Sequence, residues 1–323
     1  MRRLLAGRLL QGAVIVVLVT TITFFLIHLV PGEPLATTLD SPYLTEAYRA
    51  RLRAIYGLDR PLGEQYVRYV GAVARGDLGW SFSLRRPVAD ALADALPNTL
   101  LLMGVSLALS FALGIALGVL QAMRRDTATD RVLGAVALFF YSMPDFWLAL
   151  MAMLLFAYWL PIFPVGGMVD PVMHPYLGFW GRIGDVLSHL ALPALVLTLL
   201  SAAGIARYQR AAVLEVVRQD YVRTARAKGL RERSVVVRHL LRNALLPTIT
   251  LLGLALPALL GGAVFVERVF AWPGMGLLTV NAIATRDYPL VTASVIVASI
   301  TVVAGSLVAD VLYAVVDPRL RRR

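Results

Sequence analysis

The residues of this sequence that could carry chemistry are few and stand apart from one another. Lys228 is the only lysine, and Gly229 follows it. A phosphate-binding loop needs a glycine-rich turn that ends in lysine and then serine or threonine, so that backbone amides and the ammonium group surround a phosphate. The sequence therefore predicts no nucleotide site in this chain.

Metal and thiol chemistry find no support either. The chain has no cysteine, which excludes disulfides, thiolate nucleophiles and cysteine-ligated metals. The four histidines do not have the spacing of metal ligands: they are His28, His174, His189 and His239. We expect this chain to bind no metal and no cofactor.

Two carboxylates, Asp145 and Asp310, lie inside long apolar stretches. As a pair they could serve an intramembrane enzyme, which is the alternative function from a different class. Neither lies in a catalytic signature, and membrane carboxylates more often mark a pathway or a partnered structural position. Asp145 also follows Pro144, where it could cap a helix. We therefore expect that the chain is not an enzyme by itself.

The elements that must position these residues are long apolar helices. The chain is 59% hydrophobic and 16% charged, whereas soluble domains carry about 25% charged residues. Crossing the hydrocarbon core takes about 20 helical residues. Stretches of that length lie near 9–30, 96–123, 132–160, 186–206, 243–266 and 288–316. The sequence predicts an all-α integral membrane protein with six transmembrane helices.

The net charge of +11 is distributed unevenly along the chain. If the N-terminus is inside, the inner segments carry 20 cations and 6 anions, and the outer segments carry 11 cations and 12 anions. Cytoplasmic loops of membrane proteins show this excess of cations. We expect both termini in the cytoplasm, lipid as a partner, no nucleic acid, and a bacterial or archaeal inner membrane.

The chain divides into three parts without a linker between them. Residues 1–30 hold the N-terminal segment and first span, 31–95 form an extracytoplasmic amphipathic segment, and 96–323 hold five spans with a cytoplasmic loop at 207–242. Apolar spacing in the amphipathic segment predicts short surface helices, which are expected over 45–58, 60–70 and 87–97. They either cap the bundle or help to dock an external partner.

The third span is longer than one crossing needs, and Pro144 interrupts it. Proline removes a helical hydrogen bond and kinks a helix. We expect residues 132–142 at the inner interface and residues 145–160 across the membrane.

The loop over residues 220–248 is strongly basic, with seven cations against two anions. Gly229 divides it and has the freedom to join two short helices at an angle. Before the glycine, Val217, Tyr221 and Ala225 share a face; after it, Val236, Leu240 and Ala244 share another. Such a hairpin with an apolar ridge either enters a groove on another protein or lies on anionic headgroups.

This loop resembles the cytoplasmic "EAA" loop of binding-protein-dependent ABC importer permeases. Arg223, Thr224 and Ala225 occupy the Glu-Ala-Ala places, Gly229 is the glycine, and Leu245-Leu246-Pro247 forms the exit. The glutamate and the first alanine are replaced, but YVRTARAKGL is similar to the dipeptide/oligopeptide branch. VPGEP, YGLDRPLGEQYVRYV, RGDLGWSF, VFVERVFAWPGMGLL and DVLYAVVDPRLR look like the first permease subunit of that branch.

The resemblance implies a function and a set of partners. The chain would form, with a sister permease, the pathway for dipeptides or oligopeptides delivered by an extracytoplasmic binding protein. Two cytoplasmic ATPase subunits would bind ATP and Mg and act on the hairpin. Related permeases that carry nickel or glutathione remain an alternative. The expected coupling residues are Tyr221, Arg223, Thr224, Ala225, Lys228, Gly229, Leu230, Val236, Leu240 and Pro247.

Residues that face the pathway are less defined in the sequence. In AWPGMGLL, residues 271–278, proline and glycines break any helix, which fits either a gate-lining turn or a surface turn. The polar candidates could instead bond to neighbouring helices. The pathway or gate candidates are Ser106, Ser110, Asp145, Trp272, Pro273, Gly274, Asn281, Thr292 and Asp310.

Overall fold

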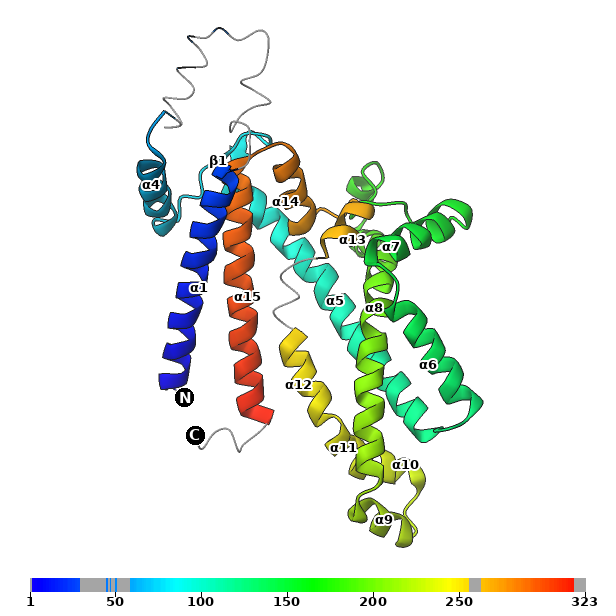
Figure 1. The fold of residues 1–323 in the computed structure, drawn as a ribbon. Coiled ribbons are helices and arrows are strands. Elements are labelled where there is room, and N and C mark those ends of the chain that lie inside the picture. Colours follow the sequence, from blue (N-terminus) through cyan, green and yellow to red (C-terminus); the bar gives the residue numbers. More distant parts are fainter. Residues whose placement is uncertain are drawn as a thin grey trace. The chain divides into compact units, whose positions relative to one another are not determined.

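The computed structural model describes residues 2–29, 45, 47, 50, 59–255 and 263–316, and most of its regular structure is helical (Figure 1). The long helices are α1 (Arg2–Leu29), α5 (Val88–Met123), α8 (Phe179–Val217) and α15 (Tyr288–Val316). The shorter ones are α4 (Leu62–Ala74), α6 (Ala128–Tyr141), α7 (Asp145–Met153), η1 (Leu154–Trp159), η2 (His174–Tyr176), α9 (Asp220–Ala227), α10 (Glu232–Ser234), η3 (Val235–Leu240), α11 (Leu241–Ala244), α12 (Leu246–Ala255), α13 (Val264–Val269) and α14 (Met275–Ala284).

A small antiparallel ladder departs from the all-helical expectation. Strands β1 (Trp80–Ser81) and β2 (Arg86–Pro87) pair Trp80 with Pro87 and Ser81 with Arg86. At two residues each, the strands only close a tight loop before α5.

The four long helices each contain a segment long and apolar enough to cross a membrane. Two further helix pairs pass the same test but are bent: α6 with α7–η1 by 101°, and η3–α11 with α12 by 47°. The described residues thus hold four candidate spans, or six if each bent pair is one span. The fold is that of a helical membrane protein, as expected.

The break in the third stretch lies where Pro144 predicts it. Helix α6 ends at Tyr141 and α7 begins at Asp145, with Pro144 as the N-cap residue and no side-chain capping bond. Asp145 is therefore the first residue of α7 and not its cap. Its carboxylate still favours this helix end, because the helix N-terminus carries partial positive charge.

The described chain forms two compact units. One comprises residues 1–97 with 274–301, and the other comprises residues 98–273 with 302–323. Each unit therefore combines segments that are distant in the sequence.

In the first unit, the apolar core joins α5, α14 and α15. Val88 and Leu92 pack there with Met275 and Leu290, all at most 5% exposed. The separate surface helix expected over 87–97 is wrong, since these residues form the first turns of α5, which continues past Pro97. Their apolar face is buried in this core and does not lie on a surface.

Helix α4 confirms the amphipathic helix expected over 60–70. Its Tyr66 hydroxyl bonds to Thr21, and the Tyr69 ring stacks on Phe24 of α1. Burial raises the pKa of the Tyr69 hydroxyl above its ordinary value. The helix expected over 45–58 lies almost entirely outside the described residues.

The second unit is built around α8. Leu192 and Val196 of α8 pack against Leu148 of α7 and Phe270, which follows α13. A further cluster joins Trp272 to α5 and α8. Helix α8 has 39 residues, about 58 Å at 1.5 Å per residue, so it is longer than the roughly 30 Å hydrocarbon core.

Candidate functional site

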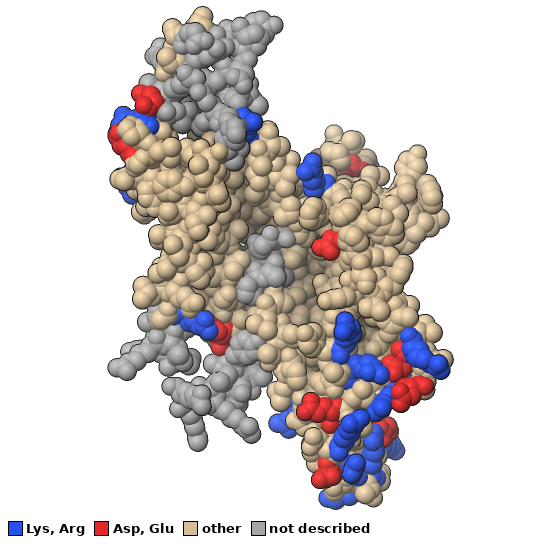
Figure 2. All heavy atoms as spheres, viewed as in Figure 1, with Lys and Arg blue, Asp and Glu red and all other residues tan. Residues whose placement is uncertain are grey.

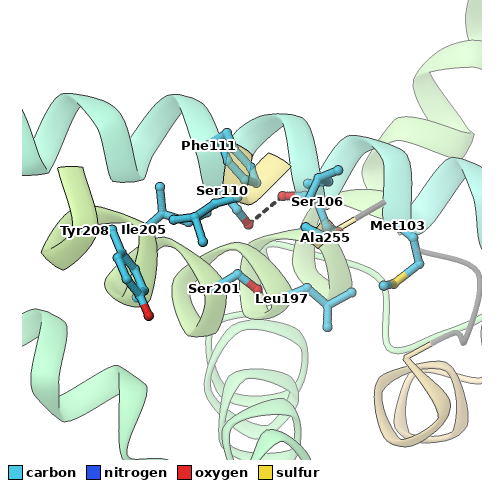
Figure 3. Close-up of a pocket in the computed structure, with 12 residues that line it drawn as sticks. Met103, Ser106, Ser110, Phe111, Leu197, Ser201, Ile205, Tyr208 and Ala255 are labelled. Atoms are coloured by element: carbon cyan, nitrogen blue, oxygen red, sulfur yellow. Dashed lines mark hydrogen bonds between the residues drawn. The ribbon is translucent and has the colours of Figure 1, made fainter. Parts of the chain in front are cut away.

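A cavity of about 310 Å³ lies among α5, α8 and α12 of the second unit (Figure 3). Its walls are mostly apolar, and three serines interrupt them. The lining residues are Met103, Ser106, Leu107, Ser110, Phe111, Leu197, Ser201, Gly204, Ile205, Tyr208, Leu251 and Ala255. Three candidate spans therefore enclose a space that a small apolar or amphipathic molecule fits.

Two of the predicted pathway residues, Ser106 and Ser110, line this cavity. The Ser106 hydroxyl donates to Leu102 O and the Ser110 hydroxyl donates to Ser106 O, both at 2.6 Å. Each hydroxyl proton is thus used within α5, which is how serine is usually accommodated in a membrane helix. Ser106 and Ser110 therefore present hydroxyl oxygens to the cavity, and both hydroxyl groups are hydrogen-bonded.

Two glycines of α5, spaced as G-x-x-x-G, bring α5 close to α8. A Cβ atom at Gly114 would lie 2.7 Å from the Ile205 side chain, and one at Gly118 would lie 2.6 Å from Ala206 O. Real side chains do not come that near, so only glycine permits this approach. The motif is readable in the sequence, but its partner helix is not.

The C-terminal part of α8 is joined by polar contacts to its neighbours. Gln209 is fully buried; its Nε2 donates to Ala244 O at 3.2 Å, and its Oε1 accepts the Thr248 hydroxyl. Arg210 donates from Nε and Nη2 to the two oxygens of Asp130 on α6, at 3.0 and 2.7 Å. The first contact links α8 to the junction of α11 and α12, and the second links it to α6.

The basic hairpin follows α8 directly. Helix α9 ends before Gly229, whose φ of +74° lies in the left-handed region that glycine favours. Val222 and Ala225 of α9 pack against Val235 on the other arm. The bend at Gly229 that the sequence predicts is present, and the two arms pack on each other.

The expected apolar ridge on the second arm does not face outward. Leu240 and Ala244 are fully buried against Ala212 and Val213 of α8, and Val236 is half-buried. The ridge is thus covered by this chain's own helix. The same holds for Ala225 on the first arm, which is 6% exposed.

The outer side of the hairpin carries the charge. Figure 2 shows acidic and basic side chains gathered over the end of this unit that bears α9 and α10. Seven of the ten predicted coupling residues are exposed: Tyr221, Arg223, Thr224, Lys228, Gly229, Leu230 and Pro247. These residues lie where a partner could contact them.

Two contacts fix the shape of the hairpin. Arg226 donates to both carboxylate oxygens of Glu232, at 3.2 and 2.7 Å, across the Gly229 turn. This bond raises the pKa of the Arg226 guanidinium. The Asn243 amide donates to the Tyr221 hydroxyl at 2.8 Å, which ties α9 to α11.

The predicted gate residues of AWPGMGLL lie in three different settings: the core, the surface and a helix N-terminus. Trp272 is fully buried, and its indole N–H donates to Asn98 O at 2.9 Å. It is a core residue of the second unit and does not line the cavity. Pro273 is exposed, and the adjacent Gly274 is the N-cap of α14.

The remaining pathway candidates do not line the cavity among α5, α8 and α12. Asn281 is exposed on α14, and Thr292 is buried on α15 with its hydroxyl donating to Tyr288 O; both belong to the first unit. Asp145 is exposed on α7, and Asp310 is half-buried on α15. Of the nine candidates, only the two serines meet at this cavity.

Sequence reasoning also missed several buried polar side chains. Glu267 is fully buried and accepts the Thr99 hydroxyl at 2.8 Å. Asp287, also fully buried, accepts the Ser81 hydroxyl and both the amide and the hydroxyl of Ser83. These hydroxyl and amide partners lie 168 to 206 residues away in the chain, so no local pattern could have found these bonds.

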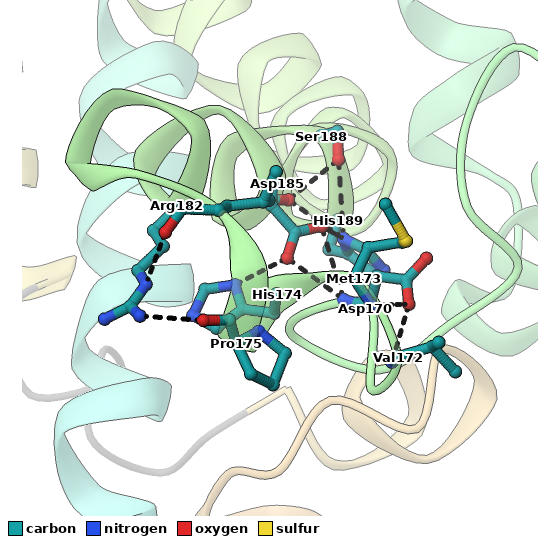
Figure 4. A network of polar contacts seen from close by, with 10 residues as sticks. Asp170, Val172, Met173, His174, Pro175, Arg182, Asp185, Ser188 and His189 are labelled. Atoms are coloured by element: carbon teal, nitrogen blue, oxygen red, sulfur yellow. Dashed lines mark hydrogen bonds and ion pairs between the residues drawn. The ribbon is translucent and has the colours of Figure 1, made fainter.

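A polar network holds the loop before α8 (Figure 4). Asp185 accepts from His174 Nδ1 at 2.6 Å, lies 3.1 Å from His189 Nδ1, and accepts the Asp170 amide. The backbone amides of Met173 and Val172 donate to Asp170 and lower the pKa of its carboxyl group. Among the described residues, no group of three or more metal-ligating side chains is arranged to hold an ion.

Comparisons with known proteins identify the family of this chain. The family model "Binding-protein-dependent transport system inner membrane component" matches residues 114–322, and the N-terminal model of such membrane components matches residues 1–103. The dipeptide transport system permease protein of Escherichia coli K12 is 37% identical over 94% of both chains. The oligopeptide transport system permease protein of Bacillus subtilis is 39% identical over 97% of both chains.

A solved structure shares the fold. A chain of the MetNI methionine ABC transporter, in an inward-facing conformation, matches with a TM-score of 0.54 at 20% identity, over 70% of this chain and 96% of that one. The family model over residues 114–322 covers more than half of the chain, including α8 and the hairpin, so the chain belongs to the inner membrane components of binding-protein-dependent transport systems. It is a multi-pass permease subunit of an ABC importer and not an enzyme in itself.

Proposed function

We propose that this chain and a sister permease subunit together form the membrane pathway of an importer for dipeptides and oligopeptides. The Escherichia coli and Bacillus subtilis relatives are named for these substrates and align over at least 94% of this chain. Their names favour peptides over nickel or glutathione. The mostly apolar cavity with its serine oxygens suits a substrate that has an amide backbone and varied side chains.

In this proposal the energy comes from other subunits. An extracytoplasmic binding protein delivers the peptide, and two cytoplasmic ATPase subunits bind ATP and Mg. The exposed residues of the hairpin, such as Tyr221, Arg223 and Leu230, contact an ATPase subunit. The buried residues Ala225 and Leu240 position the hairpin against α8 and do not themselves touch the partner.

One observation carries the proposal: a single helix connects the cavity to the hairpin. Helix α8 lines the cavity from Leu197 to Tyr208 and holds the α11–α12 junction through Gln209. It then packs on Leu240 of the hairpin. A displacement of the hairpin by an ATPase would therefore move one wall of the cavity.

Transport by the reconstituted importer tests the substrate. The complete complex in proteoliposomes, with its binding protein, should accumulate labelled dipeptide only when ATP is inside with the ATPases. Nickel or glutathione in excess should not compete. ATP-driven uptake of nickel or glutathione without peptide uptake would contradict the proposal, as would ATP hydrolysis by the purified chain alone that a substitution in this chain abolishes.

Cysteine labelling tests the orientation, with both termini inside. The chain has no native cysteine, so single introduced cysteines report unambiguously. Leu84→Cys, at an exposed position beside the β1–β2 ladder, should react with an impermeant reagent from outside the cell. Ala227→Cys, exposed on the hairpin, should react only after the membrane is opened. The opposite pattern would overturn the orientation.

A further inference from the structure

A second cavity adjoins the serine-lined one on the inner half of α8. It measures about 360 Å³ and is lined by Tyr141, Gly204, Arg207, Tyr208 and Ala211. Gly204 and Tyr208 line both cavities. The two spaces are therefore neighbours along one face of α8, and Figure 3 shows Tyr208 at the end of the row that Ser201 and Leu197 continue.

This face of α8 is not built to meet lipid chains. Its exposed positions are small or polar, namely Ser201, Arg207, Tyr208 and Ala211. Membrane helices place such residues against other helices or a water-filled space, because a polar group in hydrocarbon is costly. Helix α6 differs, since it exposes large apolar residues such as Val136 at 46% and Phe139 at 58%.

Arg207 is the positively charged residue among those that line the second cavity, and its guanidinium group contacts a tyrosine ring. Its guanidinium carbon lies 5.7 Å from the centre of the Tyr141 ring, within the range of a cation–π contact. In the described part of the chain no acidic side chain forms an ion pair with Arg207. Arg210, three residues along, is by contrast fully engaged by Asp130.

We propose that Arg207, with Tyr141 and Tyr208, forms a subsite for the C-terminal carboxylate of the transported peptide at the inner end of the pathway. The planar guanidinium offers paired N–H donors that match a carboxylate, and each phenol can donate one more hydrogen bond. The neighbouring apolar cavity then receives a side chain of the peptide. This inference rests on the proposed function, because it takes a peptide as the substrate.

The subsite must be weak to be useful. A transported molecule has to leave each site that it enters, so tight binding would slow import. Ion pairs of partly exposed side chains contribute up to about 1 kcal/mol, which corresponds to about a fivefold change in an equilibrium constant. We expect effects of this size and not a complete loss of transport.

The test compares a dipeptide that has a free C-terminal carboxylate with its C-terminal amide in the reconstituted importer. Uptake per ATP hydrolysed is measured for the native complex and for complexes with Arg207→Gln and Arg207→Lys. Because the binding protein is the same in all of them, the change in the acid-to-amide ratio reports on the permease. Arg207→Gln should lower that ratio about fivefold by reducing acid uptake only, and Arg207→Lys should retain part of it.

A control variant and the lipid composition distinguish a peptide subsite from a general loss of charge and from a lipid-binding site. Arg131→Gln, which removes an exposed cation of α6 outside both cavities, should leave the ratio unchanged. An equal fall of acid and amide uptake in Arg207→Gln would overturn the subsite. A loss of uptake that appears only in vesicles containing phosphatidylglycerol, and not in vesicles of phosphatidylcholine, would also overturn it, because it would assign Arg207 to a lipid headgroup. If the native importer carries neither peptide, the proposed function itself fails.

Discussion

The cavity and the hairpin of this permease are held by opposite means. Beside the cavity, α5 and α8 touch because Gly114 and Gly118 have no side chains, and the cavity residues Ser106 and Ser110 bond to backbone oxygens within α5. The hairpin is short and charged on its outer side; a glycine turn bends it, its two arms pack on each other, and an ion pair joins Arg226 to Glu232. The cavity should therefore be sensitive to added volume, whereas the hairpin should be sensitive to backbone conformation.

The largest effect is expected from adding one methyl group between α5 and α8. In Gly118→Ala the new Cβ would lie 2.6 Å from Ala206 O and 2.9 Å from the Arg210 amide. Overpacking of this kind costs about 1–3 kcal/mol, so the thermal unfolding temperature of the purified complex should fall. Gly104→Ala on the same helix meets nothing within 4 Å and is the matched control. Equal unfolding temperatures for the two variants would contradict the close packing.

The next effect concerns Gln209, which links the two regions. Gln209→Leu leaves Ala244 O and the Thr248 hydroxyl without this partner, and a buried polar group that loses its bond costs about 1–3 kcal/mol. We expect less substrate-stimulated ATP hydrolysis relative to the basal rate. Thr248→Val removes the hydroxyl that donates to Gln209 Oε1. The double variant should be less impaired than the sum of the two single variants, and strict additivity would show that the bond does not transmit the movement.

A smaller effect is expected at Gly229, where space is not limiting. No atom lies within 4 Å of a Cβ built there, but φ is +74°. A β-branched residue resists this conformation at a cost of about 1–2 kcal/mol, so Gly229→Val should reduce coupled ATP hydrolysis and uptake while membrane insertion and yield persist. Gly229→Asn is the control, because asparagine tolerates the left-handed region. Full activity of the valine variant would show that the bend is not needed for coupling.

The smallest effect is expected in the loop before α8. The pKa of Asp170 is lowered by the amides of Met173 and Val172, so its stabilising contribution is present above the ordinary aspartate pKa and is lost as the pH falls through the lowered value. The amide hydrogen exchange of Met173 and Val172 should become faster as the pH falls through the lowered pKa of Asp170. In Asp170→Asn that dependence of the exchange rate on pH should disappear. A pH response unchanged by the substitution would assign it to other groups.

The sequence by itself determined the class of this protein and the placement of its main features. Apolar stretches of sufficient length predict membrane helices, Pro144 predicts the break between α6 and α7, and Gly229 predicts the hairpin turn; the described structure contains all three. These features depend on composition and local backbone preference, which a single sequence displays. The same reasoning named Ser106 and Ser110 as pathway candidates, because a serine in an apolar helix is locally conspicuous, and both line the cavity.

Only the tertiary structure decided which surfaces are covered. Leu240 has the spacing of a docking ridge, but α8 buries it, and Trp272 has the setting of a gate, but it packs in the core. The start of α5 reads as a surface helix until its apolar face meets α14 and α15. Arg210 pairs with Asp130, whereas Arg207 lies over the Tyr141 ring and has no ion pair among the described residues. In each case the deciding partner lies many residues away in the chain, so no local pattern of residues could specify the contact.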